Sequence, residues 1–202
     1  MNAPIVTLPP LAAPVDQVWH LLLDLTELPV KWTLIGGQMV LLHALEHDQV
    51  PPQISQDGDV IADVRADQSA LLVVVAALEE HGFDLEVITT DGRAHRYTRP
   101  AQPSPVIIDL LAPEGLGPKT NLTTTPPGRT IEVPAGQQAL HRTELVEVRH
   151  EGRSGLIRDR HCSARSSPKL RPAPYPGTAA ATNATWRCSA RWFPIPSACA
   201  SN

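Results

Sequence analysis

Cysteine is scarce in this chain and confined to its last fifth. The three cysteines among 202 residues are Cys162, Cys188 and Cys199, and no two of them form a C-x-x-C pair. Their spacing matches neither a cysteine-based zinc site nor a disulfide framework. The fold is therefore expected to depend on a hydrophobic core, for which the 42% of hydrophobic residues is sufficient.

Long apolar runs and a positive net charge are lacking as well. The longest clean apolar run covers residues 70–78, whereas a membrane-spanning helix needs roughly 20 apolar residues. The first residues show no basic segment followed by a long apolar run, so no signal peptide is expected. The formal net charge of -4 gives no basis for non-specific nucleic-acid binding by the whole chain. We expect a soluble cytoplasmic protein with no membrane partner.

Hydrophobic periodicity and turn residues predict alternating helices and strands. Asp16 and Asp67 are expected to cap helices, and Gly82 to end one. The expected helices cover residues 16–27, 38–47 and 68–81, and the expected strands cover 31–35, 57–64, 83–88, 93–98, 106–111, 130–133 and 143–149, with a helical turn at 137–141. This order predicts an α/β (α+β) fold with a mixed β-sheet flanked by helices, rather than a doubly wound sheet.

The chain is expected to divide into three parts. Residues 1–15 are Pro-rich and predict an irregular lead-in, and residues 16–157 carry the periodic pattern of a folded domain. From 158 to 202, Ser, Ala, Arg and Pro dominate and periodicity disappears, which is typical of a disordered tail. A shifted reading frame is an alternative origin of this tail, because residues 161–171 admit codons whose shifted frame encodes an apolar helix with one lysine.

The stretch from 32 to 59 carries the main functional pattern. A short strand runs into Gly36-Gly37 at the start of a helix, and Ser55-x-Asp57-x-Asp59 follows. A glycine turn at a helix start can approach a phosphate closely, and its free N–H groups favour negative charge. Aspartates two apart on a strand point to the same face. Together these features predict a place for a metal-bound nucleoside triphosphate.

Asp109 is the third carboxylate of this pattern. It stands between Ile107-Ile108 and Leu110-Leu111, where an isolated buried carboxylate would be costly. On a strand paired beside the first two aspartates, it would complete a set of oxygen ligands suited to Mg²⁺. Two simpler interpretations remain open: Asp57-Gly58-Asp59 is a turn, and Asp109 is a strand-end residue that faces water.

With these motifs in place, the chain resembles the nucleotidyltransferase fold of the DNA polymerase beta superfamily. Within it, the chain is most similar to the abortive-infection type of minimal nucleotidyltransferase, the toxins of type IV toxin–antitoxin systems. The resemblance covers about residues 16–150 and rests on the Gly-Gly turn, the helix, the Ser-x-Asp-x-Asp segment and the later strand with Asp109.

The resemblance implies a site and an activity. Asp57, Asp59 and Asp109 would be the catalytic metal ligands, and Gly36, Gly37, Gln38 and Ser55 would bind the nucleotide. The activity implied is Mg²⁺-dependent transfer of a nucleotide from an NTP to a hydroxyl of RNA (tRNA) or protein, with a cognate antitoxin as a further partner. His95 and Arg96, on the strand before Asp109, could reach a phosphate, but an ordinary solvated strand face is the favoured interpretation for both.

Two departures from the family pattern leave open the alternative that this chain is an inactive relative. Gln53 stands where the family has arginine, and Ser55 stands where it has threonine. The related toxins also carry a helix with a functional lysine after the core sheet, and the aberrant tail indicates that this part is truncated or frameshifted here. The alternative is therefore a catalytically inactive relative that only binds nucleotide or a partner protein.

A competing motif lies on the helix after the glycines. His43, Glu46 and His47 match H-x-x-E-H, a zinc-peptidase pattern in which histidines four apart share a helix face. This motif makes a zinc hydrolase a lesser alternative. The other interpretation is a partly exposed helix end, where His47 is favourable beside the C-terminus.

Overall fold

The computed structural model describes residues 3–49, 51 and 53–160. The chain divides after His161 into two units, and the described residues all belong to the first. Its helices are α1 (Ala13–Leu25), α2 (Gly36–Glu46), α3 (Ala70–Glu80) and α4 (Gly136–His141). Its strands are β1 (Ile5–Thr7), β2 (Trp32–Ile35), β3 (Asp57–Ala62), β4 (Asp84–Leu85), β5 (Arg96–Arg99), β6 (Val106–Pro113), β7 (Glu132–Val133), β8 (Thr143–His150) and β9 (Arg153–Arg160).

Within this described part, nine strands form one mixed sheet. Eight of them follow the order β1-β8-β9-β2-β3-β6-β5-β4, and β7 pairs with β6 beside that path. The central strand β3 is antiparallel to β2 and parallel to β6. The expected α/β class with a mixed sheet flanked by helices is confirmed.

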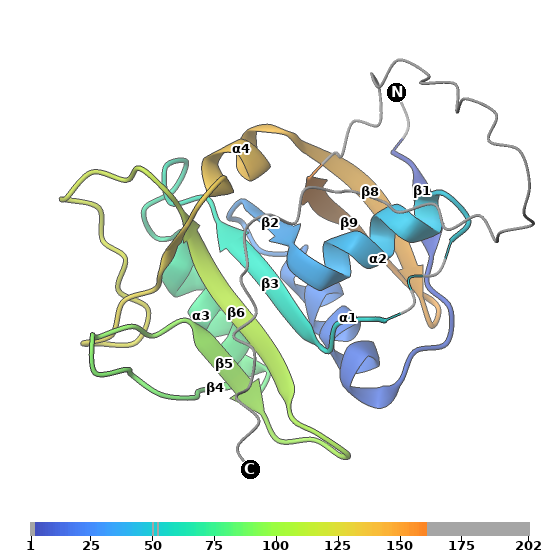
Figure 1. Cartoon of the computed structure of the whole chain (residues 1–202), viewed down its shortest axis with the longest axis horizontal. Helices are drawn as coiled ribbons and strands as arrows, with labels where there is room; N and C mark the ends of the chain where they lie inside the picture. Colours follow the sequence, from blue (N-terminus) through green and yellow to red (C-terminus); the bar gives the residue numbers. More distant parts are fainter. Residues whose placement is uncertain (1–2, 50, 52, 161–202) are drawn as a thin grey trace, which may run out of the picture. The chain divides into compact units, whose positions relative to one another are not determined.

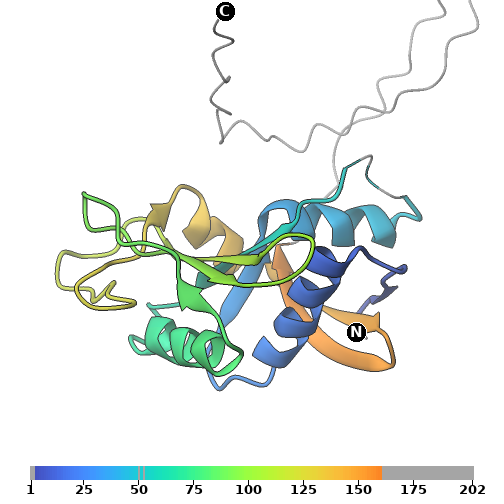
Figure 2. The same ribbon diagram turned by 90° about the horizontal axis from the view of Figure 1, so that it is seen from below.

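Helices cover both faces of the sheet. Figures 1 and 2 show α1 and α3 on one face and α2 and α4 on the other. Along β3, the fully buried Val60 and Ala62 join the larger core cluster, whereas Ile61 joins a smaller cluster with Leu111, Val133 and Ala139 of β6, β7 and α4. The alternation expected from the sequence is therefore present, and Asp57 and Asp59 share the face of Ile61.

The end of α3 also follows the sequence pattern. Gly82 adopts a left-handed φ of +78°, and its N–H donates to the Glu79 carbonyl oxygen at 2.9 Å. The next N–H, of Phe83, donates back to Leu78 at 2.9 Å, which completes a Schellman motif. Asp67 contributes differently from the expectation: its carboxylate accepts from Ser69, which is the N-cap residue of α3.

The two ends of the domain differ from the sequence prediction. The expected irregular lead-in contains β1, an edge strand that pairs in parallel with β8. The expected tail begins inside β9, which pairs with β8 over its whole length; the remainder of the tail, from 161, lies outside the described residues. Three residues among prolines are too short to show periodicity, and the charged ends of β9 concealed its two apolar residues, Leu156 and Ile157.

Asp16 is a third difference. The helix begins at Ala13, with Ala12 as N-cap and no side-chain cap. Asp16 therefore lies in the first turn of α1, where a negative charge interacts favourably with the helix dipole and stabilises the helix. Its carboxylate is directed to two histidines, His20 and His150.

Candidate functional site

The sheet register brings the three predicted aspartates together. In the parallel pairing of β3 with β6, Asp59 lies opposite Asp109, and Asp57 precedes Asp59 by two residues on the same face. One carboxylate oxygen from each lies within 4.8 Å of the others. Asp109 is buried, with 7% of its surface exposed, and the other two are half-buried. The turn and strand-end interpretations therefore do not describe these residues.

The glycines bring the start of α2 against this carboxylate group. Gly36 has a left-handed φ of +67°, and a Cβ atom built on it would lie 1.9 Å from Oδ2 of Asp59. A Cβ on Gly37 would lie 2.1 Å from Cβ of Ser55. Only glycine allows the helix to start so close to β3, and the N–H groups of a first helical turn lack partners within the helix.

Gln38 binds the backbone of the segment that leads into β3. Its side chain is fully buried, and Nε2 donates to the carbonyl oxygens of Ser55 at 2.7 Å and Asp57 at 3.2 Å. The amide therefore fixes the segment that leads into β3. Ser55 in turn donates its hydroxyl to Oδ1 of Asp57, so this carboxylate is held in place from the segment just before β3.

Arg96 is the residue of this site that the sequence did not identify. It lies opposite Asp109 in the antiparallel pairing of β5 with β6. Nε and Nη2 donate to the two carboxylate oxygens of Asp109, both at 2.8 Å, and 40% of the arginine side chain is exposed. This bond raises the pKa of Arg96 above its usual value. Only the pairing of β5 with β6 reveals that Arg96 lies beside Asp109, and a sequence does not give strand pairing directly.

The surroundings of Asp59 raise the pKa of its carboxyl group. Burial is the main reason that the pKa of Asp59 rises to about 7, and the charges of Asp57 and Asp109 raise it further. The Arg96 guanidinium opposes this rise. A divalent cation would offset the same repulsion, because it favours the charged form of every carboxylate around it.

The donor set fits a hard divalent cation. Three carboxylates converge, their charge is offset by one arginine, and oxygen ligands are those that Mg²⁺ and Mn²⁺ prefer. The described residues thus contain a group that can hold a metal ion. The start of α2 packs directly beside this group, and a helix start favours negative charge.

The H-x-x-E-H residues are arranged differently. Nε2 of His43 lies 3.0 Å from Oδ2 of the buried Asp159 on β9, and Nδ1 of His47 lies 2.8 Å from the carbonyl oxygen of His43. Glu46 and His47 are exposed. In the part of the chain that the structure describes, these residues are not among the groups of three or more possible ligands that converge.

A second convergent group was not anticipated. Asp16 and His20 of α1 meet His150 and Glu151 at the end of the β8–β9 hairpin, again with one ligand atom each within 4.8 Å. The sequence signal was weak, because 130 residues separate His20 from His150 and only the fold brings them together.

Comparison with known proteins adds no relative. No family model, no curated protein and no solved structure matches the chain. Among the described residues, no helix is long and apolar enough to cross a membrane. The geometry of the carboxylate site is therefore the basis for a function of this protein.

Proposed function

We propose that this protein is a Mg²⁺-dependent nucleotidyltransferase with the fold of the DNA polymerase beta superfamily, similar to the toxins of type IV toxin–antitoxin systems. One observation carries the proposal: Asp57, Asp59 and Asp109 converge on the sheet face against which the glycine start of α2 packs. Carboxylates beside a helix start match what a metal-bound triphosphate needs.

The proposed reaction joins the α-phosphorus of an NTP to a hydroxyl oxygen of RNA, such as tRNA, or of protein. The bond from that phosphorus to the pyrophosphate breaks, and the hydroxyl proton leaves to a base or to water. Bound Mg²⁺ would supply charge neutralisation and polarisation of the phosphate. A cognate antitoxin belongs to the same proposal as a further partner.

The chain's own residues have distinct roles in this proposal. Asp57, Asp59 and Asp109 hold the cation, and Ser55 and Gln38 orient the segment that carries Asp57. Gly36 and Gly37 let the first turn of α2 pack directly against Asp59 and Ser55, which would hold a phosphate bound at this helix start next to the cation. Arg96 balances Asp109 in the metal-free protein, and its half-exposed guanidinium is available to a phosphate once a cation takes over that balance.

Nucleotide binding without transfer is the second candidate. The observation that favours it is the bidentate Arg96–Asp109 pair, which already neutralises one metal ligand. Gln53 is exposed where the family pattern has an arginine, so one phosphate-binding charge is missing.

The test is an incubation with NTPs labelled at the α-phosphate, Mg²⁺, and either total tRNA or total protein. We expect label on an acceptor with the natural chain and none with Asp57→Asn/Asp59→Asn. Asp84→Asn removes a charge from an exposed residue of β4 and serves as the matched control. Label that survives the double substitution refutes the site, and Mg²⁺-dependent NTP binding without any transfer supports the second candidate.

A further inference from the structure

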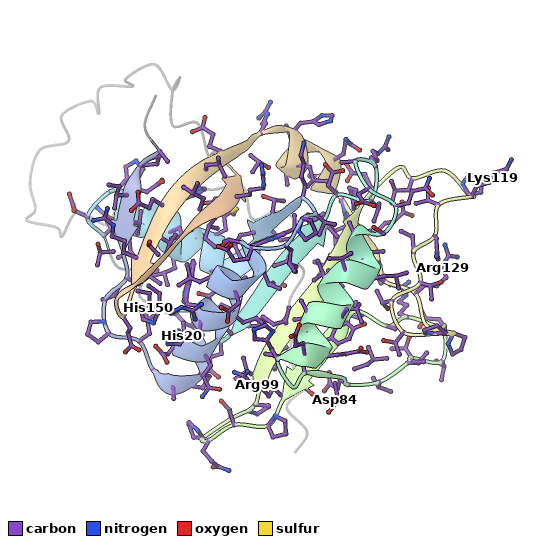
Figure 3. The ribbon with its side chains drawn as sticks, turned by 180° about the vertical axis from the view of Figure 1, so that it is seen from behind. His20, Asp84, Arg99, Lys119, Arg129 and His150 are labelled. Carbon is purple, nitrogen blue, oxygen red and sulfur yellow. The ribbon has the colours of Figure 1, made fainter. Side chains whose placement is uncertain are left out.

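The second convergent group joins the first helix to the last hairpin. Asp16 and His20 stand four apart on α1, so both side chains lie on one helix face. His150 ends β8, and Glu151 follows it in the two-residue turn to β9. Figure 3 labels His20 and His150 side by side. Their ring centroids are 5.2 Å apart.

The turn presents Glu151 at a conformational cost. Glu151 and Gly152 have φ values of +45° and +79°, the pattern of a type I′ turn that favours Asn and Gly. A glutamate in the left-handed region is uncommon and stores strain. Its carboxylate is directed to Nε2 of His20, at 3.3 Å.

The distances within the group match a tetrahedral metal site. Oδ1 of Asp16 lies 2.7 Å from Nε2 of His150, and Oδ2 of Asp16 lies 3.7 Å from Nε2 of His20. Ligands bound to Zn²⁺ at about 2.1 Å in a tetrahedron stand about 3.4 Å apart, which lies between these two distances. Side-chain rotations of Asp16, His20 and the exposed Glu151 around the buried His150 would therefore close the site.

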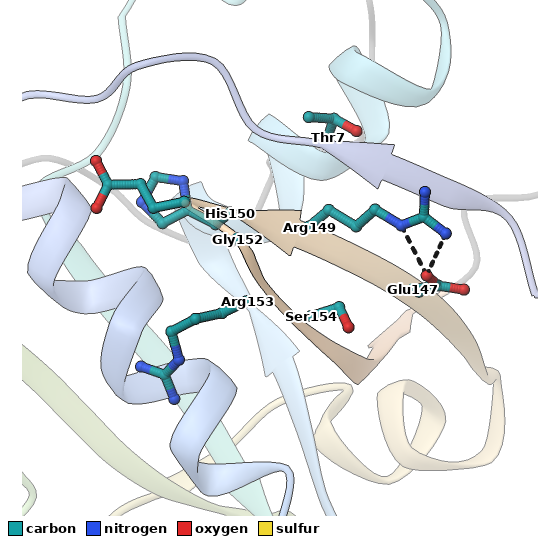
Figure 4. A pocket seen from close by; sticks show the side chains of 8 residues that line it. Thr7, Glu147, Arg149, His150, Gly152, Arg153 and Ser154 are labelled. Atoms are coloured by element: carbon teal, nitrogen blue, oxygen red, sulfur yellow. Dashed lines mark hydrogen bonds and ion pairs between the residues drawn. The ribbon is translucent and has the colours of Figure 1, made fainter.

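The arginines beside this group form ion pairs with carboxylates other than Asp16 and Glu151. Arg153 ion-pairs with Asp24 of α1, and Arg149 ion-pairs with Glu147 at 2.7 Å (Figure 4). Two carboxylates and two imidazoles thus remain, which together offer Zn²⁺ two oxygen and two nitrogen ligands. Imidazole nitrogen suits zinc, whereas Mg²⁺ prefers oxygen alone, so this group differs in kind from the three aspartates.

We propose that Asp16, His20, His150 and Glu151 form a structural site for Zn²⁺ or a similar divalent transition metal. Both histidines bind through Nε2 as neutral imidazoles and carry their proton on Nδ1. Nδ1 of His20 lies 3.3 Å from Nη1 of Arg153 in the metal-free protein. A proton on Nδ1 would remove this contact, because both nitrogens would then be donors. Arg153 would still keep its ion pair with Asp24.

The site would fasten α1 to the β8–β9 hairpin. His150 is 3% exposed and supplies a rigid ligand, whereas the Glu151 side chain is 64% exposed and can close over an arriving ion. A surface hollow lined by residues 150–154 opens beside the group and gives the ion a path from solvent. Four protein ligands leave no open position, which is typical of a structural metal.

The test is a Zn²⁺ titration of the full chain after metal removal, followed by calorimetry and by the temperature of unfolding. All variants carry Asp57→Asn/Asp59→Asn, so that the sheet carboxylates do not contribute. We compare His20→Gln and Glu151→Gln with the matched control His81→Gln, which removes a histidine paired with a single carboxylate, Asp24, at 3.3 Å.

We expect one equivalent of Zn²⁺ to bind and to raise the unfolding temperature. Outer-shell partners of a metal change affinity by about 10–100-fold, so loss of the ligand His20 should weaken this equivalent by at least about a hundredfold. His81→Gln should leave it unchanged. Because Glu151 is exposed, Glu151→Gln should fold even if His20→Gln does not, and should weaken binding at least about tenfold. Binding equally strong in both ligand variants and the control, or no stoichiometric binding, overturns the proposal.

Discussion

Asp59 has three structural roles at the candidate site. It pairs with β2 and β6 in the centre of the sheet, it touches the start of α2, and its carboxylate lies beside two others. Burial and those neighbours raise the pKa of Asp59 to about 7, so a proton partly neutralises the three carboxylates near neutral pH when no cation is bound. If this site binds a divalent cation as proposed, binding should release a proton, and the affinity for the cation should rise as pH increases to about 7.

The same shift predicts how stability depends on pH. The folded pKa of Asp59 exceeds its unfolded value, so the native state holds more protons than the unfolded state between those two values. The metal-free protein consequently loses stability as pH rises through about 7. Asp59→Asn should increase the free energy of unfolding in urea with chelator by on the order of 1–3 kcal/mol at pH 8 and by much less at pH 5. An equal effect at both pH values, or the same pattern in Asp84→Asn, contradicts the account.

Arg96 gives a prediction that couples stability to metal. In the metal-free protein, Arg96→Ala leaves the buried Asp109 unbalanced and should cost about 1–3 kcal/mol of unfolding free energy. With saturating Mg²⁺ this cost should fall, because the cation balances Asp109 instead. Arg149→Ala breaks a more exposed ion pair with Glu147 on β8, and its cost should not respond to Mg²⁺. A Mg²⁺-independent cost of Arg96→Ala would show that the arginine and the cation do not share Asp109.

At the scale of elements, the β2–α2 connection determines the site. The helix starts directly after the strand because Gly36 turns the chain in the left-handed region, and no loop separates the two. The sequence predicted this arrangement well, since glycines, helix periodicity and alternating aspartates are all local signals. It could not supply the partner of Asp109, because Arg96 meets it only through the β5–β6 register.

Gly36→Ala separates backbone strain from contact with the site. The new Cβ would meet Oδ2 of Asp59 at 1.9 Å, in addition to the cost of a positive φ. Gly92 has a similar φ of +77° with nothing within 4 Å, so Gly92→Ala measures the backbone cost alone, about 1–2 kcal/mol. We expect Gly36→Ala to cost at least about 2 kcal/mol more in urea unfolding and to weaken Mg²⁺ binding. Equal costs for the two variants would contradict the close approach of α2 to Asp59.

At the scale of the whole molecule, the class of fold was predictable and the strand order was not. Local patterns located most elements of the sheet, but β1 is a three-residue edge strand whose partner lies 142 residues later, as in the pair Ile5 and Glu147. The strand β8 was expected at 143–149, but β9 was missed for a different reason: Arg, Asp and Ser cover its ends, although Asp159 is buried against His43. Without β9 the sequence did not reveal the β8–β9 hairpin, whose packing on α1 brings the histidine group together.

Among the residues that the structure describes, two chemically different groups could hold a metal ion: three carboxylates on one face of the sheet, and two histidines with two carboxylates between α1 and the hairpin. The carboxylate group should bind Mn²⁺ as a substitute for Mg²⁺, and the histidine group should prefer Zn²⁺. Variants that alter one group should therefore leave the preferred metal of the other group bound.

A Mn²⁺ titration at pH 8, read from the paramagnetic signal of the free ion, tests the carboxylate site most directly. The account predicts one or two Mn²⁺ ions per chain, with affinity reduced at least about a hundredfold by Asp57→Asn/Asp59→Asn and unchanged by Asp84→Asn or His20→Gln. Mn²⁺ binding that persists at full affinity in Asp57→Asn/Asp59→Asn, or that is absent from the natural chain, would contradict it.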